Sequence, residues 1–169
     1  MSSWGEVRRD TPDLAAAGES LLYQHGVGLG YLATVAMDGT PRVHPMCPLL
    51  HDRGMFAFII ASPKQADLHR GGAYAMHSFP RPDDEDAFFF KGRARLVTDT
   101  DLRRELSEQF VAERARFAIP VPVADDHLFE FDIERALLTT TTGHGDTMPS
   151  KRTWRAPVSH AQRSSRLST

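Results

Sequence analysis

The chain has 169 residues, which is enough for about one domain and excludes a cofactor domain joined to a separate substrate domain. Hydrophobic residues make up 41% of it and charged residues 25%, so an intrinsically disordered chain is also excluded. The net charge of -2 combines an acidic body with a basic end, since residues 151–169 hold five cations and no acid. Nucleic-acid binding depends on neutralising phosphates, so we expect no nucleic-acid partner.

Cysteine and histidine usage restricts the chemistry further. Cys47 is the one cysteine, which excludes an internal disulfide and any Cys-x-x-Cys motif and indicates a reducing, cytoplasmic location. The eight histidines lack metal-ligand spacing, so we expect no metal site. Residues 1–30 place charges among short apolar pieces, which indicates neither a membrane span nor a secretion signal.

The first third of the chain predicts one helix and then strands. Residues 1–12 are expected to form a loose N-terminal arm, and residues 13–25 a helix that ends at Gly26. Three strands are expected, at residues 31–37, 40–50 and 55–61. Asp38-Gly39 is a strong hairpin turn between the first two, and the unbroken apolar run of the third predicts burial on both faces.

The remainder predicts two helices among further strands. Ser62 and Pro63 begin a short helix that ends at Gly71-Gly72, and residues 100–116 carry the apolar stripe of a longer one. Four strands are expected, at residues 73–78, 87–97, 128–132 and 136–142. The connections are expected to be a proline-broken stretch at 119–123, a loop from 143, and a disordered basic tail at 159–169.

This order of elements predicts the fold class. Strands joined mostly by hairpins, with too few helices to link parallel neighbours, favour a mainly β fold with flanking helices, an antiparallel barrel rather than a doubly wound sheet. We expect the folded domain to span residues 13–158.

The start of the short helix is the first candidate site. A buried strand containing Ile59, Ile60 and Ala61 runs directly into it. A helix start offers free backbone donors and the positive end of the dipole, to which Ser62 adds a hydroxyl and Lys64 an ammonium. The sequence therefore predicts a phosphate site here; the alternative is an ordinary capped helix with a solvated lysine.

The second strand is the other candidate. Alternation places Arg42 and His44 on one face, and Val43 and Pro45 on the other. Because proline cannot donate a ladder hydrogen bond, we expect an edge strand or a bulge, against which a planar ligand can lie. The alternative is an edge strand whose prolines and charges prevent aggregation.

These segments occur in runs that resemble a known family. The runs are GYLATVAMDGTPRVHPMCPLLHDRGMFAFIIASPKQADL, then YAMHSFP, then FKGRARLVTD. Together they are similar to the pyridoxamine 5'-phosphate oxidase-like FMN-binding split-barrel family, over about residues 26–140. The resemblance implies a split β-barrel that binds FMN as a homodimer, with both cofactor sites at the interface.

The resemblance also implies roles for residues. Ser62 and Lys64 match the family's Ser-x-Lys phosphate contacts, and residues 59–61 would pass beneath the ring system. His44 stands where the oxidases usually have an arginine, a charge that Arg42 would replace. Gly92-Arg93-Ala94 matches a turn in the long strand and is expected to be structural.

Two departures from the family pattern affect the substrate. Ala87 aligns with a glutamine of the oxidases, and their C-terminal arginine and histidine motif is absent, so we do not expect activity on pyridoxamine phosphate. In that place stand Trp154 and Arg155, which would cover a bound ring and grip a phosphate. The alternative is that Trp154 anchors the C-terminal segment to the core.

The sequence therefore predicts an FMN-dependent oxidoreductase acting on an unidentified small molecule. The flavin would supply the chemistry, and the sequence identifies no catalytic acid or base, with His44 and Tyr31 as the proton-donor hypotheses. The alternatives are a deazaflavin-dependent reductase on the same fold and a non-catalytic flavin-binding or haem-binding protein.

Overall fold

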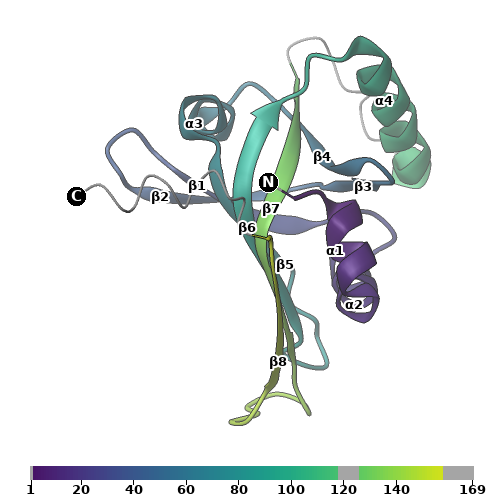
Figure 1. Cartoon of the computed structure of the whole chain (residues 1–169), viewed down its shortest axis with the longest axis vertical. Coiled ribbons are helices and arrows are strands. Elements are labelled where there is room, and N and C mark those ends of the chain that lie inside the picture. The colour runs from purple at the N-terminus through teal and green to yellow at the C-terminus, as the bar shows by residue number, and fades with distance from the viewer. Residues whose placement is uncertain (1, 118–125, 158–169) are drawn as a thin grey trace.

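The computed structural model describes residues 2–117 and 126–157. Within them, an antiparallel sheet is curled into a half-barrel with helices along its sides (Figure 1). This arrangement confirms the prediction of a mainly β split barrel. The expectations for residues 119–123 and 159–169 lie outside the described residues.

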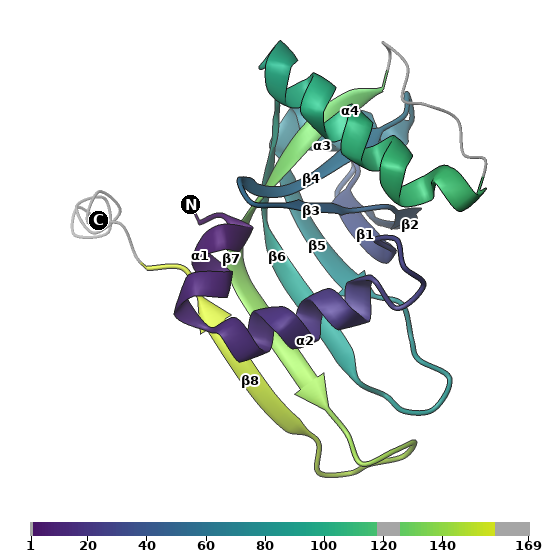
Figure 2. The same cartoon turned by 90° about the vertical axis from the view of Figure 1, so that its right-hand side faces the viewer.

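The sheet follows the order β2-β1-β5-β6-β7-β4-β3, and β8 pairs with β7. The strands are β1 Gly30–Val35, β2 Pro41–Met46, β3 Leu49–His51, β4 Gly54–Ile59, β5 Ala73–Ser78, β6 Ala87–Leu96, β7 His127–Thr140 and β8 Ser150–Arg155. Figure 2 shows β7 as the long central strand. Its first part pairs with β4 and its second part with β8, which lets one strand serve both ends of the half-barrel.

In the described part of the chain, four α-helices flank the sheet. They are α1 Trp4–Asp10, α2 Pro12–Leu22, α3 Pro63–Gly71 and α4 Thr100–Arg114, and a 3-10 turn, Ala115–Phe117, follows α4. Figure 2 shows α2 lying across β6 and β7, and α4 lying beside β3 and β4. In the described part of the chain, no helix combines the length and apolar character that a membrane span requires.

The N-terminal segment differs from the prediction of a loose arm. Residues 4–10 form α1, in which Trp4 and Val7 are fully buried. Ser3 and Glu6 form a reciprocal capping box, with the Ser3 backbone N–H donating to Glu6 at 2.7 Å. The helix forms because this cap satisfies the first backbone donors and because the two apolar side chains, three residues apart, share one buried face.

Three strand predictions also need correction. The strands expected at 128–132 and 136–142 are one strand, β7. Glu134 forms a β-bulge that interrupts the alternation of the sequence pattern, and β7 continues to pair with β6 after it. The strand expected at 40–50 is two, β2 and β3, separated by Cys47-Pro48. The loop expected from residue 143 contains β8, which pairs with β7 along its whole length.

Other predictions are confirmed. Among the strands that the structure describes, β2 pairs only with β1 and is an edge strand, and every residue of β4 except Phe58 is buried. Gly72 ends α3 in the left-handed conformation, at φ 65°. A Cβ on Gly92 would lie 1.9 Å from the Asp132 carbonyl oxygen, so the predicted structural role of Gly92 follows from close strand packing.

Candidate functional site

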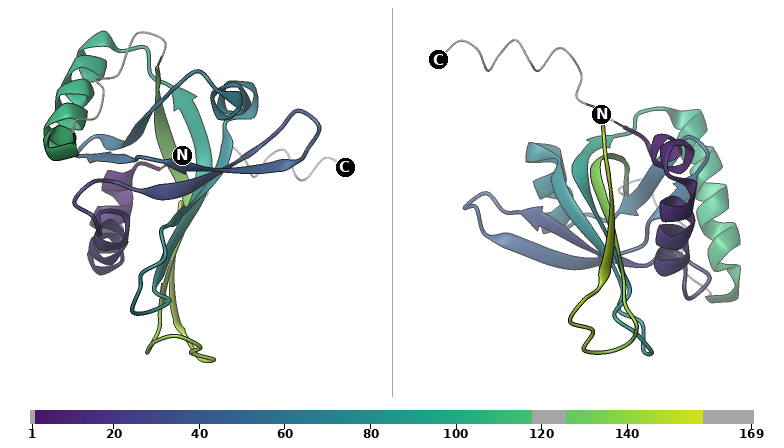
Figure 3. Two further views of the ribbon diagram at one scale, coloured as in Figure 1. Left: turned by 180° about the vertical axis from the view of Figure 1, so that it is seen from behind. Right: turned by 60° about the horizontal axis from the view of Figure 1, so that its bottom comes forward.

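The two segments singled out in the sequence lie side by side in the fold. β4 ends at Ile59, and α3 begins at Pro63 beside the edge strand β2. The Lys64 ammonium donates a hydrogen bond to the Pro45 carbonyl at 3.2 Å, which joins the start of α3 directly to β2. The left panel of Figure 3 shows α3 on the same side of the molecule as the β1–β2 hairpin.

The first turn of α3 has no side-chain cap. Ser62 occupies the capping position, but its hydroxyl donates to the Ile60 carbonyl at 2.8 Å. Pro63 has no N–H to satisfy, and the Gln65 side-chain amide donates to the Ile59 carbonyl at 2.7 Å. The positive end of the helix dipole is thus left to act on a ligand near Ser62 and Lys64.

A buried carboxylate organises the cations of this region. Asp67, only 5% exposed, accepts hydrogen bonds from Thr34 at 2.9 Å, from Arg70 at 2.8 Å and from Arg42 at 3.3 Å. Burial acts to raise the pKa of Asp67, but the bonds from Arg70 and Thr34 and the charge of Arg42 outweigh it, so this pKa is lowered. The ionised Asp67 of α3 thus holds the Arg42 side chain, which comes from β2, on the side of β2 that faces α3.

The pKa values of Lys64 and His44 are both lowered, for partly different reasons. Burial lowers the pKa of Lys64. Burial, followed by the charges of Lys64 and Arg42, lowers the pKa of His44, which keeps its imidazole neutral near pH 7. The His44 Nε2 atom is buried and has no hydrogen-bond partner. A buried ring nitrogen without a hydrogen-bond partner is energetically unfavourable. A hydrogen bond from a ligand, or a movement of the ring, would supply the missing partner.

The predicted site residues of β2 and β4 do not all face the same way. Arg42 and His44 are half-buried on the side of α3, whereas Val43 and Pro45 are exposed on the opposite face. Ile59 is buried in the core. Ile60 and Ala61 are exposed between the end of β4 and α3. The structure therefore gathers Arg42, His44, Ser62 and Lys64 on one side and leaves Val43 on the other.

The face that carries Val43 is apolar across three strands. Its residues occupy alternate positions that point outward from the sheet, and none is an aspartate, glutamate, lysine or arginine: Tyr31, Ala33, Val35, Pro41, Val43, Pro45, Ala73, Ala75 and His77. We call these nine residues the apolar face. Tyr31 packs against Phe79 with ring centroids 4.4 Å apart. A cavity of about 190 Å³ lies on this face between Tyr31, Val43 and Phe89.

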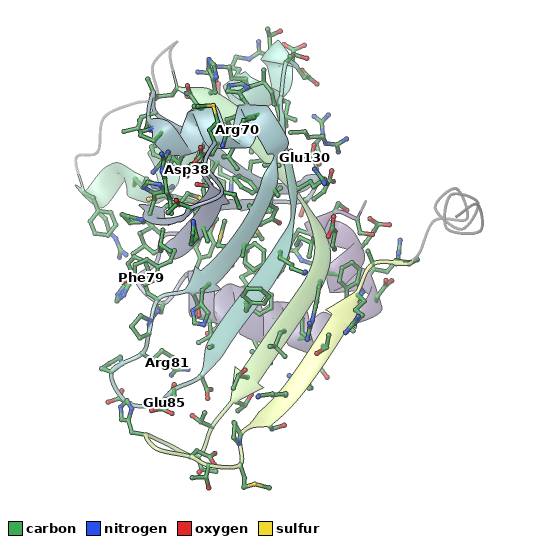
Figure 4. The ribbon with its side chains drawn as sticks, turned by 90° about the vertical axis from the view of Figure 1, so that its left-hand side faces the viewer. Asp38, Arg70, Phe79, Arg81, Glu85 and Glu130 are labelled. Carbon is green, nitrogen blue, oxygen red and sulfur yellow. The ribbon has the colours of Figure 1, made fainter. Side chains whose placement is uncertain are left out.

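Trp154 and Arg155 lie apart from the other predicted residues within one chain. Both are on β8, with four strands between β8 and β2 in the sheet. Figure 4 shows β8 at the opposite edge from Arg70. Trp154 is 5% exposed in the core, and its indole N–H donates to Asp10 at 3.2 Å, a placement that fits the anchoring alternative. Arg155 is exposed.

Sequence reasoning did not identify Asp67 and Thr34. An aspartate within a helix reads as a solvated residue, and the partners of Asp67 from the β1–β2 hairpin are 25 and 33 residues away along the chain. The one local signal is Arg70, at the i+3 position that allows an ion pair with Asp67.

No protein-family model and no curated protein matches this sequence, but solved structures do. General Stress Protein 26 from Bacillus anthracis aligns with a TM-score of 0.60 and 15% identity, over 83% of this chain and 97% of that one. A heme binding protein from Mycobacterium smegmatis aligns with a TM-score of 0.59 and 16% identity, over 82% of this chain. The present chain spans 57% of that protein's length.

A third similar structure is an F420 reductase, with a TM-score of 0.54 and 22% identity, over 70% of this chain and 94% of that one. At such identities the similarity establishes the fold. The chain is therefore a split barrel, an architecture that it shares with reductases and haem-binding proteins.

Proposed function

We propose that this protein is an FMN-dependent oxidoreductase that binds the cofactor phosphate at the start of α3. The observation that carries the proposal is the joining of Lys64 to β2 through Pro45, beside an uncapped helix start. An anion at this point meets the helix dipole and an ammonium that has two further donors. The split-barrel fold supports the proposal because reductases are built on it.

The residues present fit such a cofactor. The charges of Lys64 and Arg42 both act on His44, with Asp67 opposing them, so the start of α3 and the facing side of β2 keep a net positive charge that suits a phosphate. The exposed Ile60 and Ala61 offer apolar surface next to it, and the neutral His44 offers a ring nitrogen without a partner. FMN, when bound, supplies the transfer of hydride or single electrons. The protein's own groups bind and orient it.

We further propose that the protein acts as a homodimer in which β2 contributes to the cofactor site with one face and to the interface with the other, so that each site borders the interface. The support is the apolar face, on which Tyr31 is 40%, Val35 51% and Val43 64% exposed. Contiguous exposed apolar surfaces of this kind mark protein interfaces. A second copy of the chain is the occupant we propose, because a stable pair needs about 800 Å² per partner and this face spans three strands.

A deazaflavin-dependent reductase is the second candidate. The similar F420 reductase supports it, as does Arg70, which extends the line of cations from Arg42 past Asp67. A haem-binding role has less support from the site, because the His44 Nε2 atom is buried and would need to move to reach an iron atom.

Competitive titration separates these candidates. The full chain is titrated with FMN, and flavin fluorescence is followed as coenzyme F420 or haemin is added. We expect FMN to bind with a micromolar or tighter dissociation constant, or about -8 kcal/mol. If FMN binds more than about tenfold more weakly than F420, the deazaflavin is the cofactor, and the second candidate replaces the first. Tight haemin binding without any flavin binding would overturn it.

A further inference from the structure

One row of side chains crosses the outer face of six neighbouring strands and changes from apolar to cationic midway. Its members occupy directly paired positions on six neighbouring strands: Val43, Ala33, Ala75, Lys91, Arg135 and Arg155. The first three belong to the apolar face. The last three, on β6, β7 and β8, are all cations, and we call them the cationic ladder. Paired residues point to the same side of a sheet, so these three charges lie in one line.

The next pairs along β6 and β7 show the opposite arrangement. Arg93 pairs with Asp132, and Arg95 pairs with Glu130. Arg95 also forms ion pairs with Glu130 at 3.1 Å and with Asp132 at 3.4 Å. These neighbouring positions are therefore neutralised across the strands, whereas the cationic ladder sets like charges directly opposite one another, which is destabilising.

Within the described residues, the ladder has no acidic partner. Across residues 2–117 and 126–157, no carboxylate lies within 4.0 Å of a charged nitrogen of Lys91, Arg135 or Arg155. The Arg135 Nε atom is buried and has no hydrogen-bond partner. The β-bulge omits Glu134 from the pairing and thereby brings Arg135, rather than an acid, opposite Lys91. The three cations and the Arg135 Nε donor therefore lack an anionic or hydrogen-bond acceptor within the described residues.

We propose that the cationic ladder binds a small molecule that carries two or more acidic groups. Neighbouring strands are about 4.8 Å apart, so three cations on three strands span about 10 Å, which matches a diphosphate or a dicarboxylate. Guanidinium groups bind both kinds of acid in bidentate fashion. Two residues along each strand, the same face presents Phe89, Leu137 and Thr153, which gives the ligand's body an apolar support.

The surroundings favour a small ligand over a nucleic acid. The neighbouring pairs of β6 and β7 balance Arg93 and Arg95 with Asp132 and Glu130, so the excess positive charge ends with the ladder, which suits a short ligand rather than a polyanion. The site is separate from the proposed FMN site, since Lys64 and Arg42 lie on the side of α3 and the ladder lies at the far strands of the sheet. Anion binding by the ladder would therefore be a further property of the protein that does not depend on FMN binding at the start of α3.

Isothermal titration of the full chain with inorganic pyrophosphate at low ionic strength tests the proposal. We expect one pyrophosphate per chain, with orthophosphate at least about tenfold weaker because it spans one cation pair rather than the ladder. Lys91→Gln and Arg155→Gln should each weaken pyrophosphate binding about tenfold or more. Lys151→Gln removes the same charge from the same face of β8, opposite Thr139, and should change binding by less than about twofold.

Thermal melting shows that the variants fold and adds a second readout. Without pyrophosphate, Arg155→Gln should melt at or above the wild-type temperature, because the substitution relieves repulsion; with pyrophosphate, only the wild type and Lys151→Gln should gain stability.

The absence of pyrophosphate binding by the wild type would overturn the proposal. Binding that survives Lys91→Gln and Arg155→Gln but disappears in Lys64→Gln would also overturn it and would assign the anion to α3. A third contrary result is a change from dimer to monomer in Arg155→Gln without pyrophosphate binding by the wild type, which would assign the ladder to a contact between copies.

Discussion

The Lys64 ammonium at the start of α3 lies 3.2 Å from the carbonyl oxygen of Pro45 in β2. A proline carbonyl can accept this bond although the ring nitrogen cannot donate, so the prolines of β2 leave its outer edge open to an ammonium. Burial lowers the pKa of Lys64, yet only one of its three donors is used by this contact. The chain thus holds a partly desolvated cation in place without neutralising it.

Replacing Lys64 should separate binding from stability. Lys64→Gln removes the charge nearest the start of α3, so the dissociation constant for FMN should rise about tenfold or more. The melting temperature should stay within a few degrees of wild type, because a desolvated ammonium contributes little to folding. Flavin fluorescence titration and thermal melting measure the two effects.

Arg104→Gln is the matched control for Lys64→Gln. Arg104 is an exposed cation on α4 whose partner is Asp101, and its loss should leave FMN binding unchanged. Equal effects of the two substitutions would show that net charge, rather than the position of Lys64, governs binding.

Asp67 should contribute more to the free energy of unfolding than an exposed acidic residue does. Asp67→Asn leaves Arg42 and Arg70 without their carboxylate, and we expect it to lower the free energy of unfolding by about 2 kcal/mol, since both guanidinium groups are partly exposed. Urea denaturation measures the change. Asp101→Asn, which breaks an exposed pair with Arg104, should cost less than about 0.5 kcal/mol. A loss at Asp67 no larger than the loss at Asp101 would contradict the role of Asp67.

Acid should destabilise the protein partly through His44. Burial and the charges of Lys64 and Arg42 lower its pKa in the folded chain, with Asp67 opposing them, whereas the unfolded chain has the ordinary value of about 6.5. The stability that the neutral ring contributes is therefore complete above about pH 6.5 and is lost as the pH falls through the folded-state pKa.

Denaturation of wild type and His44→Gln at several pH values between 5 and 8 tests this statement. The difference in unfolding free energy between the two should shift against the wild type as the pH falls. Parallel pH profiles would show that the His44 ring does not titrate differently in the two states.

Trp154 should act through stability alone. It lies in the core and bonds to Asp10, so Trp154→Ala should lower the free energy of unfolding by about 3 kcal/mol or more, and Trp154→Phe by about 1 kcal/mol. The FMN dissociation constant of the folded Trp154→Phe protein should equal that of wild type. A tenfold weaker affinity with unchanged stability would instead place Trp154 on the cofactor.

The proposed dimer should dissociate when charge enters the apolar face. Val43→Lys puts an ammonium among the exposed residues that β2 contributes to this face, and we expect the mass in solution, measured by light scattering, to fall from two chains to one. Met37→Lys makes the same change at an 86% exposed side chain in the β1–β2 turn and should leave the dimer intact. A wild type with the mass of one chain would contradict the dimer itself.

Elements with strong local patterns were predictable from the sequence. The Asp38-Gly39 turn, the apolar run of β4 and the apolar stripe of α4 each specify their structure within a few residues. The helix α1 also had a local signal, the Ser3 and Glu6 capping box, but seven residues with two apolar positions gave too short a period to recognise.

Features that depend on distant partners were not predictable. β8 presents five exposed residues and the buried Trp154, so its pattern becomes that of a strand only when β7 lies beside it. The carboxylate of Asp67 is buried because Thr34 and Arg42 reach it from another element. The same holds for the cationic ladder, whose three charges are spaced irregularly in sequence and are aligned by the bulge at Glu134.

We propose that the start of α3 and the edge of β2 hold FMN. The direct measurement is the visible spectrum of the full chain after incubation with FMN and removal of free ligand by gel filtration. We predict flavin absorption that comigrates with the protein at about one FMN per chain and that falls at least severalfold in Lys64→Gln. A colourless protein, or equal FMN retention by wild type and Lys64→Gln, would contradict FMN binding at this site.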